Sequence, residues 1–315
     1  METGMEYLVA DRSSGDNMRI CTRGDLDGMT SSVLLTIVEE IDRIRFVHPK
    51  DVQDGLVTVT HKDILVNLPY AAGCGMWFDH HISEKEKSIE LSEFKGRFEI
   101  APSCARVIYN HYQHPAFESY NDLLRVTDKI DSARLTMDEV ANPAGLVLLG
   151  YTLDPRTGLG DDFREYFCWL VGVIREIPLS KVLEFPEVKE RCQRFLDEQE
   201  NCQKWLGQIC RLEDNVIITD MRKAKKAPVG NRFLVYTLFP EGNVEIRIVR
   251  GLKKNIVLIV GRSIFNKTCR VNIGKMLSRY GGGGHEGAGT CQLLPKHVNH
   301  ALKEIINQLK RNDNT

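Results

Sequence analysis

Short apolar runs alternate with helical patterns through the first part of this 315-residue chain. Strands are predicted over the runs Met18–Thr22, Leu56–Thr60, Ile64–Leu68 and Met76–Phe78. Helices are predicted over Ser31–Ile41, Ser103–Tyr112 and Tyr120–Ile130. Strands that alternate with helices indicate a parallel sheet with helices packed on its faces. We therefore expect an α/β fold for the N-terminal part of the chain.

One long helix is expected to divide the chain. Between Val188 and Ile209, apolar or small residues recur every three or four positions, which predicts a single amphipathic helix. The pattern lasts only about three heptads, which favours a connector packed on a domain over a coiled coil. After it, the sequence predicts strands over Val216–Thr219, Phe233–Phe239, Val244–Val249 and Ile256–Val260, and helices over Val271–Tyr280 and Lys296–Leu309. We expect domains over 1–185 and 215–315, joined by a connector over 186–214.

The charges are unevenly distributed along the chain, although the net charge is only −1. Residues 1–210 carry 23 basic and 35 acidic side chains, whereas residues 211–315 carry 19 and 8. An acidic part could hold cations and a basic part could attract polyanions. The alternative is that two domain surfaces of opposite charge attract each other.

Nothing in the sequence predicts a membrane or secretory segment. No apolar run approaches the roughly 18 residues that span a bilayer. The N-terminal residues lack the basic and then apolar pattern of a signal peptide. The nine cysteines contain no C-x-x-C pair and indicate no disulfide framework. We expect a cytoplasmic protein without a membrane partner.

Three polar clusters carry residues suited to bind a metal ion. Asp25 and Asp27 lie between a predicted strand and a predicted helix, where their carboxylates could face one cation. The triplet Asp79-His80-His81 follows an apolar strand and offers oxygen and nitrogen ligands suited to Mn²⁺ or a similar ion. A further carboxylate could come from Asp128–Ser132. Taken alone, the first cluster is more typical of a solvated turn with a capping aspartate.

A run of glycines marks the basic part of the chain. Gly281–Gly289 reads GGGGHEGAG and follows an apolar helix. Consecutive glycines allow backbone N–H groups to surround a phosphate, and His285 could donate to one of its oxygens. Glycine runs also form flexible loops, but the histidine and the basic surroundings favour phosphate binding.

In this order, D-x-D-G, DHH, a downstream aspartate and GGGGH resemble the motifs of the DHH/DHHA1 phosphoesterase superfamily over nearly the whole chain. Its members include RecJ-type exonucleases, oligoribonucleases and exopolyphosphatase-like proteins. The resemblance implies an α/β fold with a parallel-sheet DHH domain, a smaller α/β DHHA1 domain and a cleft between them. It also implies a divalent metal, Mn²⁺ or Mg²⁺.

The resemblance also implies roles for individual residues. Metal ligands are implied at Asp25, Asp27, His80 and Asp131, with Asp128 as the alternative to Asp131. A catalytic role at the scissile phosphate falls to His81 with Asp79. Substrate binding falls to Arg262, Ser263, Gly283, Gly284 and His285, and Ser103 matches a small hydroxyl residue that opens a helix in relatives.

Two positions depart from the family pattern. Cys21 stands where relatives have a histidine ligand, and Asn67 stands where they have an aspartate that bridges two metals. Sulfur suits softer ions than Mn²⁺, and an amide offers only a neutral oxygen. One metal site (Asp27, His80, Asp131) therefore looks intact, whereas the second (Cys21, Asp25, Asn67) looks weakened. Arg23 could replace a cation there by an ion pair.

Two functions follow from these residues. The first is hydrolysis of a phosphate polyanion, such as a short single-stranded oligonucleotide, a nucleotide or polyphosphate, by a metal-dependent phosphoesterase. The second is binding of the same ligand without turnover. Stacking of bases could involve Phe233, Tyr236, Phe239, Phe265 and Tyr280. A homodimer is left open.

Overall fold

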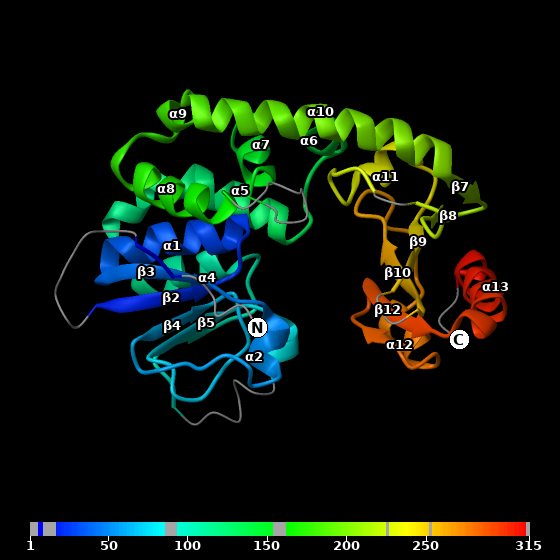
Figure 1. Ribbon diagram of the computed structural model, residues 1–315, viewed down its shortest axis with the longest axis horizontal. Coiled ribbons are helices and arrows are strands. Elements are labelled where there is room, and N and C mark those ends of the chain that lie inside the picture. Colours follow the sequence, from blue (N-terminus) through cyan, green and yellow to red (C-terminus); the bar gives the residue numbers. More distant parts are fainter. Residues whose placement is uncertain are drawn as a thin grey trace. The chain divides into compact units, whose positions relative to one another are not determined.

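The computed structural model describes residues 6–8, 17–85, 93–153, 162–224, 227–251 and 254–312. The chain divides into two compact units, Met1–Arg134 with Ala144–Gln193, and Leu135–Pro143 with Arg194–Thr315. Each unit contains one six-stranded sheet with helices packed against it (Figure 1). The expected α/β class is confirmed.

The sheet of the first unit is parallel except at one edge. Its strands lie in the order β1-β3-β2-β4-β5-β6, and only the edge strand β1 runs antiparallel to its neighbour. They are β1 (Glu6–Leu8), β2 (Met18–Thr22), β3 (Ile41–Phe46), β4 (Asp63–Val66), β5 (Met76–Asp79) and β6 (Gly96–Phe98). The carboxyl ends of the five parallel strands therefore meet at one edge, where ligands bind in open α/β sheets.

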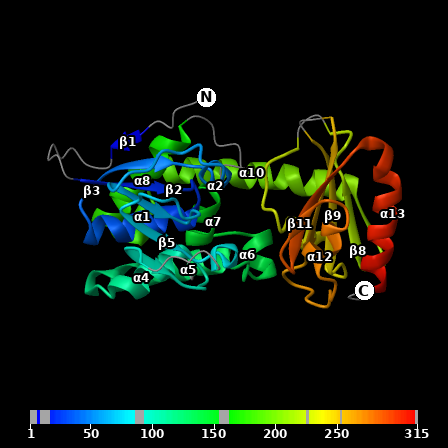
Figure 2. The same ribbon diagram turned by 90° about the horizontal axis from the view of Figure 1, so that it is seen from below.

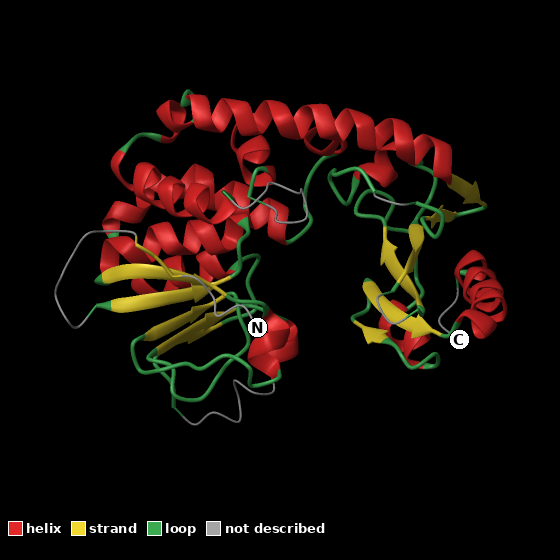
Figure 3. Ribbon diagram, viewed as in Figure 1, coloured by secondary structure: helices red, strands yellow, loops and turns green. Residues whose placement is uncertain are grey.

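Most helices of the first unit cover one face of this sheet (Figure 3). The helices are α1 (Leu26–Val38), α2 (Pro49–Gln53), η1 (Ile82–Glu84), α4 (Cys104–Tyr112), η2 (Pro115–Tyr120), α5 (Asn121–Asp131), α7 (Gly145–Tyr151), α8 (Phe163–Glu176) and α9 (Leu179–Val182). Every residue of α1 from Leu26 to Leu35 is buried, because α1 contacts α4, α5 and α8. A smaller apolar cluster with α2 lies around Leu65 and Trp77.

The second unit has a mainly antiparallel sheet, in the order β11-β12-β10-β9-β8-β7, with only β8 and β9 parallel. Its strands are β7 (Cys210–Glu213), β8 (Val216–Asp220), β9 (Val244–Arg250), β10 (Ile256–Arg262), β11 (Gly283–Gly284) and β12 (Ala288–Leu293). Its helices are α6 (Met137–Ala141), α11 (Leu234–Leu238), α12 (Ile273–Ser278) and α13 (Pro295–Arg311), with most of α10 (Pro186–Ile209).

Two apolar clusters hold the second unit together. The first joins α12 and α13 to the sheet, and α13 runs beside β8 (Figure 2). The second joins α11 and the last turns of α10 to Ile217. The amphipathic pattern of α10 is confirmed, since Val188, Phe195, Cys202 and Leu206 are buried.

Three expected elements are wrong. Leu56–Thr60 forms no strand, and Leu56 is largely exposed. The expected helix Ser31–Ile41 runs past the end of α1 at Val38 to the first residue of strand β3 (Ile41–Phe46), which the sequence did not predict. Phe233–Phe239 contains helix α11 instead of a strand, and the side chain of Asn231 accepts the N–H of Phe233 just before the helix. Short apolar runs do not distinguish strand from buried helix by periodicity alone. No helix in the described ranges is long and apolar enough to cross a membrane.

Candidate functional site

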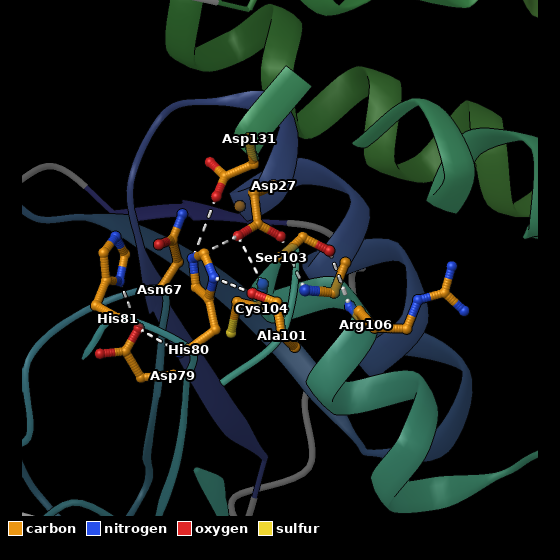
Figure 4. A network of polar contacts seen from close by, with 12 residues as sticks. Asp27, Asn67, Asp79, His80, His81, Ala101, Ser103, Cys104, Arg106 and Asp131 are labelled. Carbon is orange, nitrogen blue, oxygen red and sulfur yellow. Dashed lines mark hydrogen bonds and ion pairs between the residues drawn. The ribbon is translucent and has the colours of Figure 1, made fainter. Parts of the chain in front are cut away.

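The Asp-His-His triplet lies where the carboxyl ends of neighbouring parallel strands meet. Asp79 is the last residue of β5, Asn67 follows β4, and Asp27 lies in the first turn of α1, directly after β2. Figure 4 shows these side chains directed toward one another, together with Asp131 from the end of α5. The sheet thus brings together residues that are far apart in the sequence.

Asp27 is held by the amino end of another helix. Its Oδ2 accepts the N–H of Cys104 and its Oδ1 accepts the N–H of Ala105, both at 2.8 Å. These are the first two residues of α4, so the positive end of the helix dipole stabilises the carboxylate. Burial nevertheless raises the pKa of Asp27 well above its usual range, with the charges of Asp131 and Asp25 adding to the effect. A bound cation would stabilise this buried group of carboxylates.

His80 presents a free nitrogen to the same place. Its Nδ1 lies 3.0 Å from the carbonyl oxygen of Ala101, which can only accept, so Nδ1 carries the proton. Its buried Nε2 has no hydrogen-bond partner within the described residues and lies 3.2 Å from Asp131 Oδ2 and 3.7 Å from Asp27 Oδ2. The three side chains offer ligand atoms within 4.8 Å of one another. An imidazole that is fixed by a carbonyl through Nδ1 and faces two carboxylates with Nε2 fits a divalent metal ion.

Asp79 orients both histidines. Its Oδ1 accepts the backbone N–H of His80 at 2.8 Å and the Nδ1–H of His81 at 2.7 Å. Its Oδ2 is buried and has no partner in the part of the chain that the structure describes. Burial alone would lower the pKa of His81, but the hydrogen bond and charge of Asp79, with a contribution from Asp131, raise it overall. The side chain of His81 is 40% exposed, so its free edge can meet an anionic ligand.

The geometry separates the two candidate carboxylates of α5, Asp128 and Asp131. Asp128 Oδ1 accepts the hydroxyl of Ser103 at 2.7 Å, and its Oδ2 accepts Nε and Nη2 of Arg106 at 3.0 and 2.5 Å. Asp131, one helical turn later, faces His80. Ser103 was expected to open a helix, and it is the N-cap of α4. Its Oγ accepts the N–H of Arg106.

Asp25 and Asn67 also come together. The carboxylate of Asp25 contacts Asn67 and its own neighbours, whereas the buried Oδ1 of Asn67 has no hydrogen-bond partner within the described residues. Asp25 is the N-cap of α1, and its Oδ1 accepts the N–H of Gly28 at 2.9 Å and the amide of Asn67 at 3.3 Å. Its Oδ2 forms an ion pair with Arg23 Nε at 3.2 Å. Asn67 has a φ of 57°, in the left-handed region that asparagine tolerates better than most residues.

Cys21 lies apart from these residues. Its side chain is fully buried in the apolar cluster with Leu65 and Trp77, and its thiol donates to Asp63 Oδ1 at 3.6 Å. Burial raises the pKa of Cys21 to about 12, so the thiolate form is disfavoured. Among the described residues, it belongs to neither cluster of metal-ligating side chains.

In the second unit, Arg262 contacts the glycine loop. Its Nε and Nη2 donate to the carbonyl oxygen of Val271 at 3.2 and 2.8 Å, and its Nη1 donates to Glu286 at 3.0 Å. Ser263 is buried, and its Oγ accepts the N–H groups of Phe265 and Asn266, so it stabilises a turn.

The glycines themselves form a hairpin. Gly283 and Gly284 pair with β12, and Gly284 has a φ of 149° that other residues rarely adopt. The carbonyl oxygens of His285 and Glu286 accept the first N–H groups of α12, from Gly274 and Ile273. The N–H groups of Ile273 and Gly274 therefore donate to the carbonyl oxygens of the glycine loop, whereas the side chain of His285 is exposed.

Comparison with known proteins identifies the family. The chain is similar to a solved structure, the pGpG-specific phosphodiesterase PggH of Vibrio cholerae, with 35% identity and a TM-score of 0.81. The match covers 94% of this chain and 100% of that chain. The chain belongs to the DHH family of phosphoesterases. The expected recognition, function and enzyme class are thereby confirmed, and this DHH protein is a hydrolase of phosphoesters.

Two more distant solved structures share the fold of this DHH protein. A DHH domain described as a member of the s1p family of ribosomal proteins has 14% identity and a TM-score of 0.60, over 94% of this chain and 87% of that one. RecJ of Thermus thermophilus, in complex with Mn²⁺, has 14% identity and a TM-score of 0.57, over 94% of this chain and 52% of RecJ. No family model matches the sequence, and no curated protein does.

Several groups that support the site of this DHH protein were not predicted from the sequence. These are the carbonyl of Ala101, the amides of Cys104 and Ala105, and the side chain of Arg106. Main-chain groups leave no motif in a sequence. The one available signal was Ser103, since a serine that caps a helix marks free amides two or three positions later.

Proposed function

We propose that the protein is a phosphodiesterase that hydrolyses short linear dinucleotides such as pGpG, with one divalent cation. The observation that carries this substrate class is the 35% identity to a pGpG-specific phosphodiesterase over 94% of the chain. The acidic and histidine cluster at the carboxyl edge of the first sheet supports it, because its donors fit a metal ion.

The cation, Mn²⁺ or Mg²⁺, would be held by Asp27, His80 and Asp131, with Asp79 beside them. When bound, it supplies Lewis-acid activation of the phosphoryl group and of water. The protein positions its ligands in advance: the amino end of α4 fixes Asp27, and the Ala101 carbonyl fixes the ring of His80. Cys21 is left out of the proposed ligand set because its thiol is buried elsewhere.

His81 is the proposed catalytic donor. Asp79 holds its Nδ1–H, stabilises the protonated ring and leaves the other nitrogen to donate to a phosphoryl oxygen. Charge grows on these oxygens in the transition state, so a fixed donor is worth more there than in the ground state.

The basic second domain is proposed to bind the substrate's phosphates. Arg262 and His285 supply the charge and the exposed ring, while Ser263, Gly283 and Gly284 shape the loop that carries them. We keep 1–185 as the metal-binding domain, 186–214 as the connector and 215–315 as the substrate domain. All nine cysteines are free, which supports a reducing compartment such as the cytoplasm.

The proposal is tested by hydrolysis assays with purified protein. We expect Mn²⁺-dependent conversion of pGpG to mononucleotide, slower cleavage of a longer oligonucleotide, and no chain shortening of polyphosphate. His80→Ala should abolish turnover and weaken Mn²⁺ binding in calorimetry, whereas His297→Ala, on the exposed first turn of α13, should change neither. Equal rates on polyphosphate and pGpG, or full activity in His80→Ala, would refute the proposal.

A further inference from the structure

The carboxylate of Asp25 is already occupied by donors from this chain. Its Oδ1 accepts two N–H groups, from Gly28 and Asn67, and its Oδ2 pairs with Arg23. A cation bound to Asp25 would have to displace these contacts. Within the described residues, Asp25 belongs to no group of three or more His, Cys, Asp or Glu side chains close enough to share a metal ion.

The guanidinium of Arg23 has N–H donors available for a ligand at the same edge of the sheet. Its Nε lies 3.2 Å from Asp25 Oδ2, and within the described ranges no hydrogen bond or ion pair joins its guanidinium to any residue other than Asp25. The side chain is 40% exposed, so these nitrogens can reach a ligand. Its positive charge lowers the pKa of both Asp131 and His81, so the guanidinium lies within electrostatic reach of a proposed metal ligand and of the proposed catalytic histidine.

The charges of the cluster also favour one divalent cation together with Arg23 over two divalent cations. Asp25, Asp27, Asp79 and Asp131 provide four negative charges, and one divalent cation with Arg23 and the protonated His81 provides four positive ones. Asn67 adds none, whereas an aspartate at this position would add a fifth negative charge and favour a second cation. With a neutral amide at this position, the single positive charge of the guanidinium is enough, and a second divalent cation is not needed to neutralise the cluster.

We infer that Arg23 replaces a second metal ion: it neutralises Asp25 and binds the non-bridging oxygens of the scissile phosphate with Nη1 and Nη2. This inference rests on the proposed phosphodiesterase function. In the reaction, the oxygen of water forms a bond to phosphorus and the bond from phosphorus to the leaving ribose oxygen breaks. The proton lost by water passes through solvent to the leaving oxygen. Arg23 stabilises the charge that grows on the non-bridging oxygens, as a planar guanidinium does well.

The test compares Arg23→Gln with Arg97→Gln. Arg97 is a matched control, since it is 42% exposed and forms an ion pair with Glu99 at 2.7 Å in the same unit. We expect one Mn²⁺ per chain in the wild type and in both variants, with affinities within threefold. For Arg23→Gln, kcat for pGpG should fall by about 100-fold or more, as for loss of one transition-state donor. Binding of inorganic phosphate to the Mn²⁺-loaded protein should weaken at least tenfold, and Arg97→Gln should change neither.

A double variant tests whether a second metal ion can replace the guanidinium of Arg23. In Arg23→Gln with Asn67→Asp, we expect two Mn²⁺ per chain and recovery of at least tenfold in kcat over Arg23→Gln. Two Mn²⁺ in the wild type, or unchanged kcat and phosphate binding in Arg23→Gln, would overturn the inference. Absence of phosphodiester hydrolysis by the wild type would overturn the proposed function instead, since Mn²⁺ stoichiometry and phosphate binding still decide the role of Arg23.

Discussion

Arg106 and Asp128 form an ion pair that connects the two helices on which the proposed metal ligands depend. Arg106 lies in the first turn of α4, whose first amides hold Asp27. Asp128 lies on α5, one turn before Asp131. Since the pair fixes α5 against the start of α4, it sets the distance between Asp27 and Asp131. We predict that Arg106→Met weakens both folding and metal binding.

The magnitude follows from the burial of the pair. The side chains are 28% and 17% exposed, between a surface pair and a fully buried one. Breaking a surface pair costs about 0–1 kcal/mol, and removing one partner of a buried pair costs about 3–5 kcal/mol. We therefore expect a loss of about 2 kcal/mol in the free energy of unfolding. Loss of groups that orient metal ligands costs about 10–100-fold in metal affinity.

The assay is urea unfolding without metal, combined with calorimetric titration of Mn²⁺. Arg125→Met is the control, because Arg125 pairs with Asp122 on the same helix while both side chains are largely exposed. It should lose less than about 1 kcal/mol and keep its Mn²⁺ affinity. If Arg106→Met bound Mn²⁺ as tightly as Arg125→Met, the ion pair would stabilise the fold without positioning the ligands.

Three further predictions concern other parts of the chain. Cys21→Ala should leave Mn²⁺ affinity within twofold in calorimetry, since its thiol lies among apolar side chains; a tenfold loss would make it a ligand. Gly284→Ala should cost about 1–3 kcal/mol in unfolding, because of its φ of 149° and a Cβ only 2.2 Å from the Ala288 oxygen, whereas Gly283→Ala, with open space around it, should cost less. Equal costs would contradict the hairpin geometry. Burial raises the pKa of Cys21 and of Cys168 from 9.0 to about 12. As the pH rises, these thiols therefore ionise at a lower pH in the unfolded chain than in the folded protein. Stability should therefore fall between pH 9 and 12, by about 1.4 kcal/mol per pH unit for each thiol, and Cys21→Ala with Cys168→Ala should flatten that slope in denaturant titrations.

Much of the site could be predicted because its residues follow strands. Asp27, Asn67 and the Asp-His-His triplet each come after an apolar run, and parallel strands bring such positions to one edge. The order of motifs and the long helix α10 were likewise readable, since they depend on spacing within one segment. The sequence therefore determined the α/β class, the family and most of the proposed ligands.

Other features depended on contacts between distant segments. Asp128 and Asp131 are equivalent by spacing, and only the packing of α5 on α4 directs one to Arg106 and the other to His80. Cys21 lies on the strand that leads into the site, but successive side chains of a strand point to opposite faces, and its own points into the apolar cluster. The amides that hold Asp27 belong to a helix 77 residues later. Tertiary structure alone decided these points, because the groups that a side chain meets are set by packing and register, not by its neighbours in the chain.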